Sequence, residues 1–172
     1  HAIEVDSKML VDPGQNIAPN VPSIETTVRA NPDGGFSVAT YTGGIETGAK
    51  VAHGLGKKPD MIITKTIDAV SSWSVYHSDL GAENWILLNN TDPKVTSSQE
   101  WGDTEPTDTT FTIGTSGMAN NNIGASVAYS FSSVPGVSSI GSYVGNGDVD
   151  GPMVNCGFKP RFILLKSVGA GD

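Results

Sequence analysis

Acidic side chains gather in one stretch of the chain, close to two tryptophans. The acidic residues are Glu83, Glu100, Asp103, Glu105 and Asp108, and the tryptophans are Trp85 and Trp101. Two carboxyl groups beside an aromatic surface are what a glycoside hydrolase uses to cleave a glycosidic bond. The segment 99–110 is also polar throughout, which is typical of a solvated loop. We therefore expect no enzyme here, and keep polysaccharide cleavage as the alternative.

The aromatic residues of this region also suit sugar binding without catalysis. Flat aromatic faces pack on sugar C–H groups, while neighbouring polar side chains bond the hydroxyl groups. The candidate glycan-binding residues are Trp101, Tyr76, His77, Trp73 and Trp85. For Trp73 and Trp85 a place in the core is the competing interpretation, because both belong to alternating segments. Trp101 lies in a polar segment, so we expect its side chain to be exposed.

A second motif matches part of a calcium-binding loop. Asn146, Asp148 and Asp150 place oxygen ligands at positions 1, 3 and 5, and Gly151 follows at position 6. Position 12 is Gly157, so the bidentate glutamate of such loops is missing. A polar hairpin turn explains the same residues without a metal. We expect no cofactor, with a calcium ion as the alternative.

Composition narrows the class of protein. The 172 residues carry a net charge of −8, which argues against nucleic acid or an anionic membrane surface as the partner. Charged residues make up 16% of the chain, against about 25% in an average protein, and there are 21 glycines. The apolar runs are far shorter than the roughly 20 residues of a membrane helix, so we expect no membrane insertion.

The elements that must position these side chains are short strands. Apolar and polar residues alternate in segments separated by turn residues, and no segment keeps a helical period. We expect strands near residues 36–41, 61–66, 73–77, 85–89, 110–114 and 125–131, with shorter ones at 25–29 and 49–53. For 25–29 we expect the pairing strand to lie upstream of residue 1. The pattern predicts an all-β fold, an antiparallel β-sandwich of the jelly-roll or lectin-like kind.

The sequence also repeats itself after about a hundred residues. Three short motifs recur: residues 41–44 recur at 143–147, residues 53–55 at 156–158 and residues 58–65 at 159–166. We divide the chain into an extended connector with the end of an upstream unit (1–34), a first repeat (35–136) and the start of an incomplete second repeat (137–172). Tyr41 and Tyr143 should then occupy equivalent positions, and 162–166 should form a strand like 61–65.

The repeated words resemble a known domain. Residues 35–43, 53–59 and 73–77 are similar to an uncharacterised repeat domain of tail-associated and fibre-like proteins of tailed bacteriophages. Residues 127–131 and 141–147 fit the same pattern, so the resemblance covers 25–172. One departure is Gly43-Gly44, where that family favours Gly-Asn-Gly, and the second copy keeps the family's form.

The resemblance implies an extracellular, virion location and a structural or adhesive role in a tail or fibre. It supplies no catalytic motif. The partners that it implies are other virion proteins, further copies of the same chain in a homo-oligomer, and a host-surface glycan. By analogy with fibre proteins we expect a trimer. The alternatives are a polysaccharide-degrading enzyme module and a spacer or decoration domain without a ligand.

Overall fold

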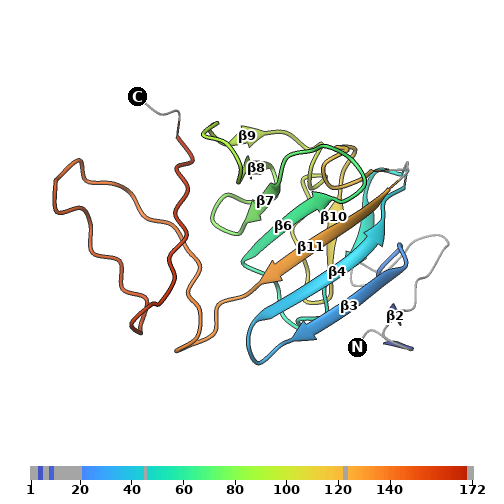
Figure 1. Ribbon diagram of the computed structural model, residues 1–172, viewed down its shortest axis with the longest axis horizontal. Coiled ribbons are helices and arrows are strands. Elements are labelled where there is room, and N and C mark those ends of the chain that lie inside the picture. The colour runs from blue at the N-terminus through green and yellow to red at the C-terminus, as the bar shows by residue number, and fades with distance from the viewer. Residues whose placement is uncertain (1–3, 6–7, 10–20, 45, 122–123, 170–172) are drawn as a thin grey trace.

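The computed structural model describes residues 4–5, 8–9, 21–44, 46–121 and 124–169 (Figure 1). In these residues the chain forms strands and no helix, so they contain no helix that could cross a membrane. The strands are β1 (Glu4–Val5), β2 (Lys8–Met9), β3 (Thr26–Asn31), β4 (Phe36–Thr42), β5 (Ala49–Ala52), β6 (Met61–Thr66), β7 (Ser74–His77), β8 (Asn84–Leu87), β9 (Val95–Thr96), β10 (Thr110–Ile113) and β11 (Ala125–Phe131).

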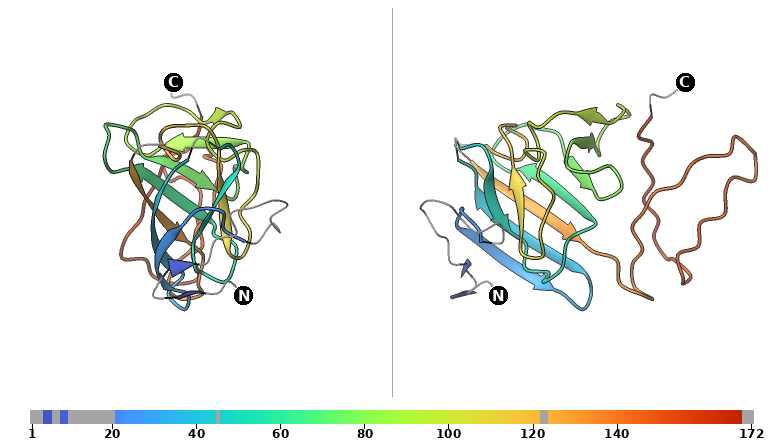
Figure 2. Two further views of the ribbon diagram at one scale, coloured as in Figure 1. Left: turned by 90° about the vertical axis from the view of Figure 1, so that its right-hand side faces the viewer. Right: turned by 180° about the vertical axis from the view of Figure 1, so that it is seen from behind.

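The strands make two layers of unequal size. The large sheet has the order β1-β2-β3-β4-β11-β6-β7-β8-β9, and the small sheet consists of β10 and β5 (Figures 1 and 2). Every pairing is antiparallel. The chain is therefore an all-β, antiparallel β-sandwich, as the alternating sequence predicts. Each of the six longer strands expected from the sequence is present within one or two residues of its predicted bounds.

The core lies between the two sheets. Its buried residues are Val28, Ala39, Tyr41, Ala49, Val51, Ala52, Ile62, Tyr76, Ala82, Trp101, Phe111, Ile113, Ala119 and Ala128. The rings of Tyr76, Trp101 and Phe111 meet edge to face, with centroids 6.0 Å and 6.4 Å apart along that series. On β11 the inward residues are small: Ser126, Ala128 and Ser130 are all fully buried.

Strand β3 pairs differently from the sequence expectation. Its six residues pair with β4 from Thr26↔Tyr41 to Asn31↔Phe36, and the upstream strand β2 meets it only at Lys8↔Thr27. The main partner of β3 is thus downstream, joined through the tight turn at residues 32–35. Gly35 closes this turn with φ at +67°, and a Cβ there would lie 2.3 Å from the Ser132 carbonyl oxygen.

Residues 140–169 do not form the second set of strands that the repeat predicts. The segment is extended and carries no strand, and it lies to one side of the sandwich (Figure 1). Tyr143 is 51% exposed, whereas Tyr41 is 4% exposed, so the two are not equivalent. The prediction of a strand at 162–166 is wrong for a physical reason. Strand β6 lies between β11 and β7, and no such neighbours flank 162–166 among the described residues.

Candidate functional site: the outer face of the large sheet

The face of the large sheet that points away from the small sheet, here called the outer face, carries a continuous apolar row. The register places Tyr129 opposite Val38 on one side and Ile63 on the other. Ile63 is in turn opposite Val75, and Val75 is opposite Ile86. Residues directly opposite each other on paired strands point to the same face of the sheet. These five residues therefore lie side by side across β4, β11, β6, β7 and β8.

Aromatic rings extend this row. Trp73 stacks on Tyr129 with centroids 6.3 Å apart and an interplanar angle of 26°, and Phe36 packs on Phe131 at 5.0 Å. The Trp73 backbone N–H donates to Asn89 Oδ1 at 2.9 Å, which holds this end of β7 in place. Ile63, Val75 and Ile86 are buried beneath the larger side chains, which remain half-buried. The outer face is therefore apolar and aromatic, and partly exposed.

The structure separates the five residues that the sequence proposed for glycan binding. Trp73 and His77 are half-buried on the outer face, because each lies two residues from Val75 and therefore points to the same side of the sheet. Tyr76 points into the core, and Trp85 packs against the core from the inner side of β8. The prediction of an exposed Trp101 is wrong, since only 2% of its surface is accessible.

Trp101 is buried because its loop folds across the open end of the core. The Gly102 backbone N–H donates to the Ser98 carbonyl at 2.8 Å, and this turn directs the indole between Tyr76 and Phe111. Sequence reasoning also missed Tyr129, the ring on which Trp73 stacks. Its signal was available, because Tyr129 alternates with the small residues Ala128 and Ser130 on β11.

His77 adds a polar group at the end of the outer face. The Asp79 backbone N–H donates to His77 Nδ1 at 3.2 Å, so in this tautomer Nε2–H is the ring's donor. Met61 is opposite His77 in the register and belongs to the same apolar cluster. The outer face thus combines a stacked aromatic pair with a nearby imidazole donor, the two kinds of group that bind sugars.

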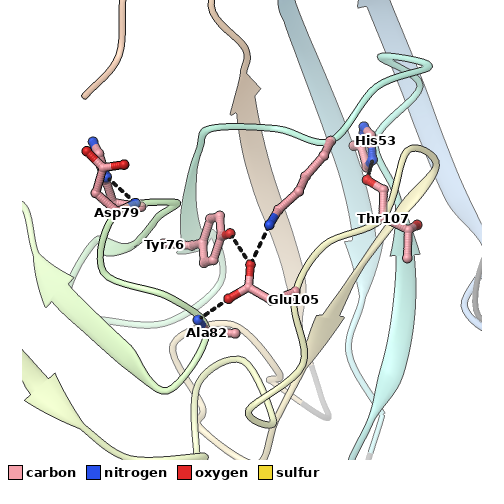
Figure 3. Close-up of polar contacts among 8 residues, drawn as sticks. His53, Tyr76, Asp79, Ala82, Glu105 and Thr107 are labelled. Carbon is pink, nitrogen blue, oxygen red and sulfur yellow. Dashed lines mark hydrogen bonds and ion pairs between the residues drawn. The ribbon is translucent and has the colours of Figure 1, made fainter. Parts of the chain in front are cut away.

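The carboxyl group of Glu105 holds a loop to the sandwich. Its Oε2 accepts from the Tyr76 hydroxyl at 2.6 Å and from Lys58 Nζ at 2.7 Å, and its Oε1 accepts from the Ala82 N–H at 2.7 Å (Figure 3). Partial burial by itself raises the pKa of Glu105, but the three donors outweigh it and hold that pKa below its usual value. Lys58 and Glu105 are each 47% exposed, so their ion pair adds little stability.

Glu100 is in the opposite situation, fully buried in the core. Burial raises its pKa to about 7, and the nearby Ser116 and Ser74 hydroxyls only partly oppose that shift. Neither carboxyl oxygen has a partner at full hydrogen-bond geometry. One carboxyl group is therefore sealed in the core and the other is held by three donors. Together they do not form a pair that is open to a sugar chain.

His53 fastens the same end of the sandwich from inside. Its Nδ1 accepts from the Leu55 N–H at 3.3 Å, so Nε2 carries the proton and faces the Thr107 carbonyl at 3.3 Å (Figure 3). Burial lowers the pKa of His53 to about 4, against the opposing effects of the Thr107 carbonyl and of Asp108. The ring is therefore neutral at pH 7.

The residues proposed as calcium ligands form an exposed turn. The Asp148 N–H donates to Asn146 Oδ1 at 3.1 Å, and the Gly151 N–H donates to the Asp148 carbonyl at 3.1 Å. The Asp150 side chain is exposed at the end of this turn. Within the described part of the chain, no three His, Cys, Asp or Glu side chains lie close enough together to hold a metal ion.

Replacing Glu105 tests its role as a fastener. We expect Glu105→Ala to lower the free energy of unfolding by about 1 to 2 kcal/mol, because the buried Tyr76 hydroxyl and the Ala82 N–H lose their acceptor. Urea unfolding measures the change. Glu83→Ala, the same substitution at an exposed position on the neighbouring loop, should stay within about 0.5 kcal/mol of wild type. Equal effects of the two substitutions would contradict the assignment.

Comparison with known proteins places the chain in a family. No curated protein and no solved structure matches it significantly. The DUF7483 domain, a domain of unknown function, matches residues 12–172. That span includes the segment 140–169 as well as the sandwich. The chain therefore belongs to the DUF7483 family.

Proposed function

We propose that this chain is a structural and adhesion module of a bacteriophage virion, part of a tail or fibre protein, and that its outer face contacts a host-surface glycan. The observation that carries the proposal is the second apolar face of the large sheet. One face already holds the core of the sandwich. The other presents the stacked Trp73–Tyr129 pair and the half-buried ring of Phe131.

The chemistry of the outer face suits a glycan. A contiguous apolar and aromatic patch on a folded domain is typical of a contact surface. Indole and phenol faces pack on the C–H faces of pyranose rings, and the His77 Nε2–H is placed to donate to a hydroxyl group. The placement in a virion is supported by the resemblance of the repeated sequence words to tail and fibre domains. The turn-rich, all-β fold of the chain agrees with that placement.

Glycan-array binding with paired tryptophan variants tests the proposal. Trp73, directly before β7, and Trp85, on the neighbouring strand β8, are both half-buried. Trp73 lies on the outer face of the sheet and Trp85 on the inner side. We expect Trp73→Ala to weaken glycan binding about tenfold or more, since losing one stacking surface costs about 1.4 kcal/mol. Trp85→Ala should bind as wild type does once both variants are shown to be folded.

The remaining outcomes separate the alternatives. Binding without release of shorter saccharides supports adhesion, and saccharide release favours the polysaccharide-degrading alternative. If wild-type protein binds no glycan on the array or on host cell-surface polysaccharide, the adhesive part of the proposal is wrong, and a spacer or decoration domain remains. If Trp73→Ala and Trp85→Ala weaken binding equally, the outer face is not the site.

A further inference from the structure

We propose that residues 159–168 of one copy of this chain bind the β9 edge of the large sheet in a second copy, so that copies join head to tail. The inference rests on the structural role proposed above, and it names the partner and the contact. Below, residues 159–168 are called the donor segment, and β9 with the preceding residues 92–94 is called the acceptor edge.

The donor segment has the sequence of a buried strand but is in solvent. Four apolar residues in succession, Phe162, Ile163, Leu164 and Leu165, are 49–80% exposed. In an extended chain neighbouring residues point to opposite sides, so this run is apolar on both sides. A strand with that pattern is usually covered on both faces. Such a run in solvent is a surface for association.

Strand β6 shows which contacts a strand of this sequence makes, because the donor segment repeats the β6 sequence at residues 159–166. Ile62 and Ile63 on β6 are both buried although they point to opposite faces. β6 is also paired along its length with β11 and β7. The donor segment therefore requires a neighbouring strand and apolar cover, which a sheet edge bordering an apolar face supplies.

The acceptor edge already pairs with the end of the donor segment. The Lys94 backbone N–H donates to the Val168 carbonyl at 3.0 Å, and Lys166 Nζ donates to the Asp92 carbonyl at 2.9 Å. β9 is the last strand of the large sheet, and Val95 and Thr96 are both exposed. Beside it on β8, Ile86 belongs to the outer-face cluster. The edge thus has exposed residues and an apolar neighbour.

Within one chain this contact stops short. Among the described residues, Lys166 and Val168 make the hydrogen bonds to the acceptor edge. The segment before them lies to one side of the sandwich (Figure 1). The four apolar residues remain exposed as a result. The edge of a second copy is not restrained by the connection through residues 139–158, so it can align with the apolar residues 162–165 of the donor segment. Pairing between copies therefore covers apolar surface that pairing within one chain leaves in water.

Charge favours the same pairing. The donor segment carries Lys159, Arg161 and Lys166 and no acidic residue, in a chain whose net charge is −8. The acceptor edge itself carries the exposed residues Asp92 and Lys94, and the exposed Glu83 directly precedes β8 beside it. A segment with three positive charges is attracted to the acidic surface of another copy, whereas two donor segments repel each other. This argues for contact between the donor segment and a different surface over contact between two donor segments.

A contact between two different surfaces repeats from copy to copy. It gives a ring if the rotation closes and a linear array if it does not. The trimer expected by analogy with fibre proteins would be a ring of three such contacts.

The test is sedimentation velocity on the full chain over a range of concentrations. We expect wild type to associate as concentration rises, and less so in high salt. A donor variant, Phe162→Glu with Leu164→Glu, should be monomeric, because it puts two charges in place of apolar contact residues. Both positions are exposed, so the fold of one copy should be unchanged. An acceptor variant, Lys94→Pro, removes the N–H that pairs with Val168 and should be monomeric too. Val95→Lys is a second acceptor variant in case Lys94→Pro perturbs the fold. Val70→Glu, at a fully exposed apolar site in the β6–β7 loop, should associate as wild type does.

Mixing the variants gives the decisive result. The donor variant keeps an intact edge and the acceptor variant keeps an intact segment, so an equimolar mixture should form a one-to-one heterodimer and nothing larger. The inference is overturned if the mixture stays monomeric, or if wild type is monomeric at every concentration. Trp73→Ala should leave association unchanged, and the donor variant should leave glycan binding unchanged. Failure of this inference is thus distinguishable from failure of the proposed adhesive function.

Discussion

A Trp101→Ala variant is expected to lose about 3 to 5 kcal/mol of the free energy of unfolding, the usual cost of removing a buried tryptophan from a core. The indole is 2% exposed and contacts the rings of Tyr76 and Phe111 edge to face. Its removal leaves a cavity between the rings of Tyr76 on β7 and Phe111 on β10. Urea unfolding followed by circular dichroism measures the loss.

Trp73→Ala is the control for this prediction. It removes the same number of atoms from the outer face, where the indole is only half-buried and stacks on Tyr129. We expect a cost of about 1 to 2 kcal/mol, since less apolar surface returns to water. If the two substitutions cost the same, the indole of Trp101 is not a core side chain, and the loop 98–104 lies elsewhere.

Glu100→Gln is expected to change how stability depends on pH. The folded-state pKa of Glu100 is about 7, above its ordinary value of 4.5, because the carboxyl is buried. The folded protein then holds this proton more tightly than the unfolded chain does. Stability from this group is complete below pH 4.5 and is lost as pH rises to 7. The loss amounts to about 3 kcal/mol, at about 1.4 kcal/mol per pKa unit.

His53 has the opposite effect over nearly the same range. Its folded-state pKa is about 4, below the ordinary value of 6.5, because the ring is buried. The unfolded chain binds this proton more tightly, so stability rises as pH increases from 4 to 6.5. In wild type the two trends nearly cancel. In Glu100→Gln the His53 trend is no longer opposed, and stability should rise by about 3 kcal/mol between pH 4 and pH 8.

Chemical unfolding at several pH values measures both curves. Glu83→Gln, at an exposed site, should give a curve parallel to wild type. A stability difference between Glu100→Gln and wild type that is the same at pH 4 and pH 8 would contradict the assigned pKa of Glu100.

The strands could be predicted because the signal for them is local. Alternation within residues 36–41 or 125–131 places one face inward whatever the partner strand is. The burial of Trp101 could not be predicted, because its neighbours in sequence are polar and its contacts come from β7 and β10. The same holds for the outer face. Trp73 and Tyr129 are 56 residues apart in number, and only the register of β11 on β6 and of β6 on β7 brings their rings together.

The segment 162–166 shows the converse case. Its sequence closely follows that of β6, and the repeat therefore predicts a strand there. A strand also needs partners for its backbone groups, and those lie outside any local window of sequence. Strand propensity is a statement about fitting into a sheet, so the same word can be a strand at 61–66 and an extended segment at 162–166.

The position of β11 in the large sheet governs when the protein can fold. β11 is the last strand of the described residues in chain order, but it lies in the middle of the sheet and pairs with both β4 and β6. A chain emerging from the ribosome can form the β3–β4 ribbon and the β6–β7–β8 meander early. These two pieces join in one sheet after residue 131 has been synthesised, because β11 is the strand of the described residues that pairs with both of them. Closure therefore depends on contacts between residues distant in sequence, which is typical of domains that fold in milliseconds to seconds and expose unpaired edges while they wait.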